Sequence, residues 1–208
     1  MTKSMGVRVV LCDLGGVLID FSFDLALGEW ARAAGGDPAG LERGLVVDEA
    51  WAKFEVNLLS ERDYIDYLRH LYGLRLTDAE IVAGWNSIYI GVNDEVERVL
   101  RSVATRGLRV VAVTNTNVTH QRVWRDRFAD HLDLFDAIYS SCEIGLRKPD
   151  RAFFANVLEA EGVGAPQALF IDDSQENVDV ATALGILAFR HHGAKRLQSD
   201  LADHGVGC

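Results

Sequence analysis

Short apolar runs alternate with amphipathic stretches along much of the chain. Each run is rich in β-branched or aromatic residues and ends at polar or turn-forming residues, which is typical of buried strands. The expected strands span residues 7–12, 107–113, 136–141, 167–173 and 185–190. The helical patterns between them span residues 94–106, 118–128, 150–161 and 175–184. This alternation predicts an α/β fold, a Rossmann-like parallel sheet with helices on both faces.

Residues 22–92 interrupt this rhythm, because we find only helical patterns there and no convincing strand. The expected helices span residues 22–34, 38–46, 48–56, 60–72 and 77–89. We therefore predict an α/β core domain of residues 1–21 and 93–208, with a helical domain of residues 22–92 inserted after the first strand. Trp30, Trp51 and Trp85 lie in the insertion, where they either fill its own core or face a cleft.

Composition and charge narrow the classes of function. The 208 residues carry 21 Lys and Arg against 31 Asp and Glu, a net charge of -10. This balance argues against a nucleic-acid or anionic-membrane surface, which needs clustered positive charge. No stretch approaches the roughly 18 apolar residues of a membrane span. The three cysteines, Cys12, Cys142 and Cys208, form no CxxC pair, and reduced thiols in a cytoplasmic protein are their simplest interpretation.

Polar residues follow several of the expected strands. Ligands of parallel α/β sheets bind at the carboxyl ends of the strands. The residues at or near such ends are Asp13, Thr114, Asn115, Asp172 and Asp173, and Lys148 precedes an expected helix. Each one alone is typical of a turn or a helix cap. Together, the set is hard to assign to capping alone.

This set of side chains suits phosphoryl transfer. A carboxylate can act as the nucleophile and form an aspartyl-phosphate. Clustered carboxylates repel one another unless a cation joins them, and Mg²⁺ prefers such oxygen ligands. The metal would also screen the nucleophile from the negative phosphate, while lysine and hydroxyl donors hold the phosphoryl oxygens.

Four motifs occur in the order found in the haloacid dehalogenase (HAD) superfamily, which the sequence resembles. They are "DLGGVL" (13–18), "VTNTN" (113–117), "RKPD" (147–150) and "IDDSQEN" (171–177). The resemblance covers nearly the whole chain and implies the HAD fold with a type 1 helical cap. Details such as "FEVNLLSERDY" (54–64) look closest to sugar-phosphate phosphatases, the branch of α-glucose-1-phosphate phosphatases and the phosphatase domain of soluble epoxide hydrolase.

The resemblance also implies a role for each motif residue. Asp13 would be the nucleophile and a Mg²⁺ ligand, and Gly15 would offer its backbone carbonyl to the metal. Thr114 and Asn115 would bind the phosphoryl group, which Lys148 would neutralise while orienting Asp13. Asp173 would be the main metal ligand of the last motif. Asp172 would be a second ligand or a partner of Lys148, and Asn177 would support this acidic loop.

The sequence departs from the family pattern at Gly15, where most HAD phosphatases carry a second Asp that serves as general acid and base. Such help is typically worth ~10²–10⁴ in rate. The protein can still be a phosphatase if a cap residue, water or the substrate supplies the proton, or if the leaving group needs little protonation. Asp20 and Asp24 are acids nearby in sequence.

Other interpretations of Gly15 stay open. Haloacid dehalogenases need no leaving-group proton, but they lack the paired acids seen here as Asp172 and Asp173. Phosphonate-cleaving members use a cap lysine, for which Lys53 is the candidate. A non-catalytic module that binds a phosphoryl ligand is a third interpretation. We predict a Mg²⁺-dependent phosphatase of a small phosphorylated metabolite, with a sugar phosphate as the expected substrate. A homodimer could form through the insertion, although no pattern demands one.

Overall fold

The computed structural model describes residues 6–36 and 41–206, and these contain a parallel sheet of five strands. The strands are β1 (Val9–Cys12), β4 (Arg109–Thr114), β5 (Ala137–Ser140), β6 (Ala168–Asp172) and β7 (Leu187–Arg190). Their order is β5-β4-β1-β6-β7, and every neighbouring pair is parallel. The predicted α/β class and all five predicted strands are confirmed.

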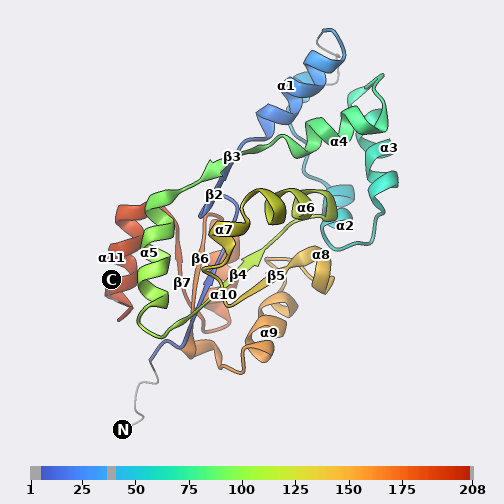
Figure 1. Ribbon diagram of the computed structural model, residues 1–208. Coiled ribbons are helices and arrows are strands. Elements are labelled where there is room, and N and C mark those ends of the chain that lie inside the picture. The colour runs from blue at the N-terminus through green and yellow to red at the C-terminus, as the bar shows by residue number, and fades with distance from the viewer. Residues whose placement is uncertain (1–5, 37–40, 207–208) are drawn as a thin grey trace.

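Helices cover both faces of the sheet (Figure 1). Because side chains alternate along a strand, Val10 and Cys12 of β1 face one side while Val9 and Leu11 face the other. The first side packs on α5 (Asp94–Ala104), α6 (Val118–Arg127) and α11 (Ala194–Asp203). The second side packs on α9 (Arg151–Ala160) and α10 (Gln175–Ala183). Shorter elements complete the core: α7 (Ala129–Leu132), α8 (Ser141–Ile144) and the 3₁₀ turn η2 (Ala165–Gln167).

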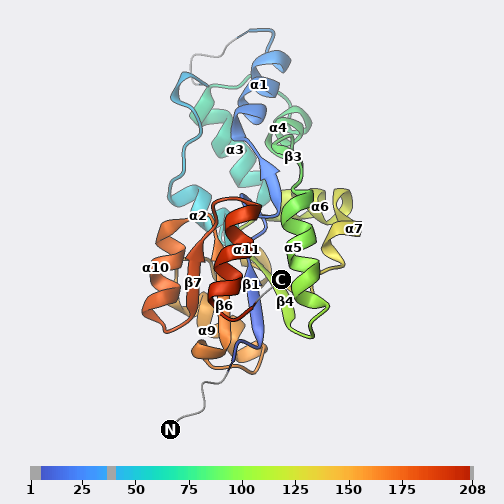
Figure 2. The same cartoon turned by 90° about the vertical axis from the view of Figure 1, so that its left-hand side faces the viewer.

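A helical insertion, Phe23–Asn86, lies beyond the carboxyl ends of the sheet strands (Figure 2). Its elements are α1 (Phe23–Ala33), the 3₁₀ turn η1 (Leu41–Arg43), α2 (Glu49–Glu55), α3 (Glu61–Tyr72) and α4 (Asp78–Asn86). Side-chain oxygens cap these helices, and Thr77 forms a full capping box with Glu80. The three tryptophans of the insertion belong to its own aromatic core.

A two-stranded ribbon connects the insertion to the sheet domain, and the sequence did not reveal it. Strand β2 (Ile19–Phe21) pairs antiparallel with β3 (Tyr89–Val92), so the expectation of no strand within 22–92 is wrong. The helix expected over 77–89 ends at Asn86. The ribbon pairs two segments about 70 residues apart, and local periodicity carries no information about such a partner.

Two further expectations about helices need correction. Of the helix expected over 38–46, only the 3₁₀ turn Leu41–Arg43 is present, while 37–40 lie outside the described residues. Helix α11 was not expected, although its Leu197 and Leu201 are buried against the sheet.

Cys12 and Cys142 are free thiols, and Cys208 lies outside the described part of the chain. Each helix in the described residues is too short or too polar to cross a membrane.

Candidate active site

Asp13 follows β1 directly and is held by the turn that comes after it. The backbone N–H of Leu14 donates to Asp13 Oδ1 at 2.8 Å. Gly16 has a φ of +74°, and a Cβ at this position would lie 2.3 Å from Asp173 Oδ2. A glycine is therefore required at position 16 both for the left-handed backbone and for the close approach of the last motif.

Lys148 lies between two carboxylates. Its Nζ is 3.0 Å from Asp13 Oδ2 and 2.6 Å from Asp172 Oδ2, with only 1% of the lysine side chain and none of the Asp172 side chain exposed. Burial disfavours the charged lysine, but the attraction of Asp13 and Asp172 outweighs it and raises the pKa of Lys148. Burial also raises the pKa of Asp13, although Lys148 opposes this shift.

The two acids of the last motif have different surroundings. Asp172 Oδ2 faces Lys148, while its Oδ1 accepts from the Ser174 N–H at 2.8 Å and from Asn177 Nδ2 at 3.0 Å. Asp173 is more exposed and lines the cavity described below, whereas Asp172 does not. Burial and the charge of Asp172 raise the pKa of Asp173. Both oxygens of Asp172 are therefore engaged by Lys148 and by its own loop, while Asp173 lines the cavity.

The carboxylates of Asp13, Asp172 and Asp173 could hold a metal ion, because one oxygen from each lies within 4.8 Å of the others. Lys148 is the cation that contacts this cluster in the described residues, so three carboxylates face one ammonium group. A divalent cation would offset the remaining negative charge, and carboxylate oxygens are ligands that Mg²⁺ prefers. The donor set fits the expected ion.

Thr114 and Asn115 leave the end of β4 and reach different partners. Thr114 is buried and lines the cavity, with its hydroxyl 3.5 Å from the Asn115 carbonyl. The Asn115 side chain binds the main chain of Lys148 twice, as donor to the carbonyl and as acceptor from the N–H, both at 2.8 Å. Both ends of this amide therefore fix the Lys148 loop, while the second N–H of Asn115 Nδ2 is a further donor at the cavity, and phosphoryl binding by Thr114 and Asn115 stays a prediction.

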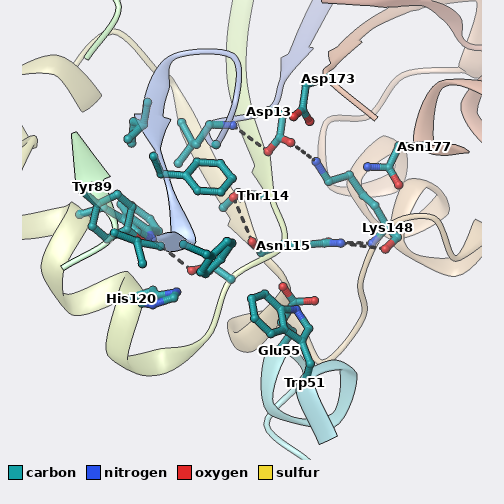
Figure 3. A pocket seen from close by; sticks show the side chains of 18 residues that line it. Asp13, Trp51, Glu55, Tyr89, Thr114, Asn115, His120, Lys148, Asp173 and Asn177 are labelled. Carbon is teal, nitrogen blue, oxygen red and sulfur yellow. Dashed lines mark hydrogen bonds and ion pairs between the residues drawn. The ribbon is translucent and has the colours of Figure 1, made fainter. Parts of the chain in front are cut away.

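A cavity of about 170 Å³ opens between these residues and the helical insertion. Figure 3 shows the acids and Lys148 on one side, Trp51 and Glu55 on the opposite side, and Thr114 and Asn115 between them. The lining residues are Asp13, Leu14, Gly15, Ile19, Phe21, Phe23, Trp51, Glu55, Ile88, Tyr89, Thr114, Asn115, Thr116, His120, Trp124, Lys148, Asp173 and Asn177. The sequence-predicted residues thus meet at one site, with Asp172 directly behind it.

Three lining residues had no role predicted from the sequence: Phe21, Glu55 and His120. Their order along the chain carries no signal, because they come from the insertion, the ribbon and α6 and meet only in the folded protein. Glu55 was part of the quoted "FEVNLLSERDY" segment but had no assigned role. Among the acids and lysines that were considered, Asp20, Asp24 and Lys53 do not line the cavity.

Gly15 has little room for a side chain. A Cβ at this position would lie 3.0 Å from Cε1 and 3.5 Å from Cδ1 of the Phe21 ring. An aspartate here would have to displace that ring, which packs edge-on against Phe23 with centroids 5.4 Å apart. The glycine is therefore packed against an aromatic wall that would have to shift to accept a larger side chain.

His120 forms a neutral part of the wall. Its Nε2 is 2.8 Å from the Trp85 carbonyl, and its Nδ1 is 3.0 Å from Asn117 Nδ2. Since a carbonyl only accepts, Nε2 carries the proton in this network and Nδ1 accepts from the amide. Burial lowers the pKa of His120 to about 4. Its ring stacks on Trp85 with centroids 4.6 Å apart. Both nitrogens are satisfied, so His120 is not a proton donor for a substrate.

The comparison with known families agrees with this geometry. The family model described as haloacid dehalogenase-like hydrolase matches residues 7–185. The chain belongs to this haloacid dehalogenase-like hydrolase family. The fold and the order of the four motifs are therefore those of a HAD hydrolase, as the resemblance implied.

Individual relatives share only about a quarter of their residues with this chain. The sesquiterpene phosphatase astK of Aspergillus oryzae is 25% identical over 86% of this chain and 87% of its own length. The drimenol cyclase drtB of Aspergillus calidoustus is 26% identical over 95% of this chain, which spans only 36% of that protein. A HAD family enzyme of Bacteroides thetaiotaomicron, solved with magnesium and inorganic phosphate, has a TM-score of 0.77. It is 26% identical, over 90% of this chain and 95% of the other.

Proposed function

We propose that this protein is a cytoplasmic, Mg²⁺-dependent phosphatase of a small phosphorylated metabolite, with Asp13 as the nucleophile. The observation that carries the proposal is the position of Lys148 between Asp13 and Asp172, with Asp173 alongside. A buried ammonium beside a buried nucleophile suits a dianionic phosphate, which needs positive charge at the point of attack. The phosphatase relative and the neighbour solved with magnesium and phosphate support this choice.

The reaction would proceed in two steps. A carboxylate oxygen of Asp13 attacks phosphorus, the ester P–O bond breaks, and the leaving oxygen takes the bonding electron pair and then a proton. Water then attacks the aspartyl-phosphate, releases inorganic phosphate and restores the carboxylate. Lys148 neutralises charge on the phosphoryl oxygens, and the Thr114 hydroxyl donates to one of them. Asn115 and Asp172 keep Lys148 in place through the contacts described above.

The metal would be held by Asp13, Asp173 and the backbone carbonyl of Gly15. When bound it would supply positive charge that screens the carboxylate from the phosphate and polarises the phosphoryl group. Asp172 would stay with Lys148, because hydrogen bonds and the ion pair already engage both of its oxygens. Asn177 would support Asp172 by donating a hydrogen bond to its Oδ1.

The leaving-group proton would come from water, because Gly15 has no acid and Phe21 fills the adjacent space. Such a site favours alcohols that depart readily, as an anomeric sugar hydroxyl does, over ordinary alkyl alcohols. A sugar phosphate with an anomeric leaving oxygen is therefore the favoured substrate class. The aromatic lining and the sesquiterpene phosphatase relative favour a second class, the phosphate of an apolar alcohol.

We also propose that residues 22–92 form a cap domain on a core of 1–21 and 93–208. The insertion contributes Phe23, Trp51 and Glu55 to the cavity, so it would exclude water and select the leaving group. Lys53 does not support a phosphonate-cleaving function, because it pairs with Glu49 at 2.8 Å on the outside of α2 and does not line the cavity.

Phosphate release from a panel of phosphomonoesters tests the proposal. The panel contains glucose 1-phosphate, glucose 6-phosphate, p-nitrophenyl phosphate and farnesyl phosphate, each with Mg²⁺ and with EDTA. We expect Mg²⁺-dependent release that Asp13→Asn abolishes, and a larger kcat/KM for glucose 1-phosphate than for glucose 6-phosphate. Release from none of them would contradict the phosphatase proposal. EDTA-insensitive chloride release from 2-chloropropionate would instead establish a dehalogenase.

A further inference from the structure

A buried carboxylate of the insertion faces the catalytic acids across the cavity. Glu55 is the last residue of α2, is 6% exposed, and lines the same cavity as Asp13 and Lys148 (Figure 3). None of the two-step chemistry proposed above uses this side chain. A buried carboxylate in a cleft is costly unless it is paired, so its partners indicate its role.

Glu55 is paired with Arg147. Arg147 Nε lies 2.8 Å from Glu55 Oε2 in an ion pair that lacks the alignment of a hydrogen bond, and the Trp51 side chain also lowers the pKa of this carboxylate. Arg147 directly precedes Lys148 in the chain, so the pair links α2 to the loop that carries the phosphate-binding lysine. Burial raises the pKa of Glu55, and the Arg147 guanidinium opposes this shift and favours the charged form.

The walls beside Glu55 are aromatic. Phe23 packs edge-on against Trp51 with centroids 5.1 Å apart, and Phe21 and Tyr89 also line the cavity. The cavity of about 170 Å³ is similar in size to engineered cavities of ~150 Å³ that bind benzene. The whole cavity, from the acids to Glu55, is therefore about the size of one ring-sized group.

The charges of the lining favour neutral or cationic leaving groups. Asp13, Asp173 and Glu55 are acidic, and Lys148 is the ammonium group among the described lining residues. Lys148 already contacts two carboxylates, and His120 has both nitrogens satisfied. A second anionic group on the substrate would meet Glu55 at close range and find no free cation there.

We infer that Glu55 is a specificity-determining residue. It accepts a hydrogen bond from a hydroxyl or amine on the leaving group and excludes leaving groups that carry a second anion. This inference rests on the proposed phosphatase function and specifies the substrate class of that site. Arg147 acts as a positioning residue, because it pairs with the Glu55 carboxylate and favours its charged form. If the ion pair between Glu55 and Arg147 only joined α2 to the core, replacing Glu55 would not change which leaving groups are preferred.

Phenyl phosphates with different para substituents test the inference. They share one ring and differ in a hydroxymethyl, aminomethyl or carboxylate group at the far end. We expect the wild-type kcat/KM to be at least ~30-fold higher for the hydroxymethyl and aminomethyl esters than for the carboxylate, since like charges that meet at close range cost several kcal/mol. Glu55→Gln should reduce this ratio to below ~3-fold by raising kcat/KM for the carboxylate ester.

Glu61→Gln is the matched control. Glu61 also joins the insertion to the core, through an ion pair with Arg122 of α6 at 2.9 Å, but it does not line the cavity. The control should keep the wild-type ratio. Equal ratios in wild type and Glu55→Gln, or an equal loss in Glu61→Gln, would overturn the inference and leave the phosphatase function intact.

Two further measurements separate the possible failures. Calorimetry with Mg²⁺ present measures how tightly each of the three esters binds to the Asp13→Asn variant. This reports the choice between leaving groups without turnover. The same preference there, with no turnover by the wild type, would contradict the phosphatase function but support the role of Glu55. If Glu55→Gln does not fold, Arg147→Gln decides, because burial without the guanidinium should raise the pKa of Glu55 further and reduce the preference for the aminomethyl over the carboxylate ester. An unchanged or larger preference would overturn the inference.

Discussion

The ring of Phe21 packs tightly beside the place where a side chain of residue 15 would begin, with Cε1 3.0 Å from the position of a Cβ on Gly15. The glycine in the first motif and the aromatic residue of β2 therefore form one local arrangement. Restoring an aspartate at position 15 without moving the ring would force a side chain into an occupied space, which typically costs about 1–3 kcal/mol.

We predict that Gly15→Asp alone does not improve the hydrolysis of ordinary alkyl phosphates, because the carboxylate cannot reach the leaving oxygen past Phe21. The double variant Gly15→Asp/Phe21→Ala should raise kcat for glycerol phosphate at least ~10-fold above Phe21→Ala, which is a modest part of the usual ~10²–10⁴ effect of a general acid. Steady-state kinetics of the three variants measure this. A large gain from Gly15→Asp alone would show that Phe21 is no obstacle.

The two neighbouring acids of the last motif should respond differently to neutralisation. Asp173→Asn should weaken Mg²⁺ binding about 10–100-fold and leave the folded structure intact, because Asp173 is the more exposed member of the cluster. Asp172→Asn should instead destabilise the protein, since it removes the ion-pair partner of Lys148. Calorimetric Mg²⁺ titrations and urea unfolding curves distinguish the two effects. Identical behaviour of both variants would contradict the division of roles.

Removing the lysine should make stability depend on the metal. Lys148→Met leaves Asp13 and Asp172 without their buried counter-charge, and breaking such a pair typically costs about 3–5 kcal/mol. We expect most of this loss without Mg²⁺ and a partial recovery at millimolar Mg²⁺, because the ion supplies the missing positive charge. Urea unfolding with Mg²⁺ and with EDTA tests this. Equal losses under both conditions would mean that the ion does not reach the cluster.

The meeting of the motif residues at one cavity could be predicted from the sequence because their positions follow from a local rule. Asp13, Thr114 and Asp173 each come directly after or close to a buried apolar run, and the ends of parallel strands meet at one edge. The departure at Gly15 was also readable from the sequence. The distinction between Asp172 and Asp173 was not, because it depends on the partners of each oxygen.

The aromatic and insertion residues that line the cavity could not be predicted in this way. Phe21, Glu55 and Tyr89 belong to a ribbon and an insertion whose placement depends on tertiary pairing, and no periodicity identifies the partner of a three-residue strand. The tryptophans were expected either to fill the core of the insertion or to face a cleft. Trp51 does both, because it belongs to that core and also lines the cavity.

Burial of His120 should make the stability of the protein depend on pH. Its folded-state pKa of about 4 lies below the ordinary value of 6.5, so the unfolded chain binds a proton that the folded protein does not. The contribution is fully present above pH 6.5 and is lost as the pH falls toward 4, by up to about 3 kcal/mol.

Urea unfolding at pH 5 and at pH 7.5 measures this effect. The wild type should lose more stability than His120→Gln between the two pH values, since glutamine does not titrate. His192→Gln is the control, because His192 is exposed and its replacement should leave the wild-type pH dependence unchanged. A similar loss in wild type and His120→Gln would assign the acid sensitivity to other groups.

Two glycines in helices of the insertion should give opposite results when replaced by alanine. Gly28 in α1 is exposed, and no atom lies within 4 Å of the position that an alanine Cβ would take. Gly28→Ala should therefore stabilise the protein by about 0.5–1 kcal/mol through helix propensity. Gly84 in α4 is buried, and a Cβ there would lie 2.3 Å from Trp30 Nε1.

The indole of Trp30 cannot easily move away from Gly84. It is fully buried, donates from Nε1 to the Ile81 carbonyl at 2.9 Å, and stacks on Trp85 with centroids 6.3 Å apart. Gly84→Ala should therefore destabilise the protein by about 1–3 kcal/mol despite its better helix propensity. Urea unfolding curves of the two variants at the same pH provide the measurement. A stabilised Gly84→Ala protein would mean that α4 and α1 can separate without loss, and the aromatic core of the insertion would then not fix their distance.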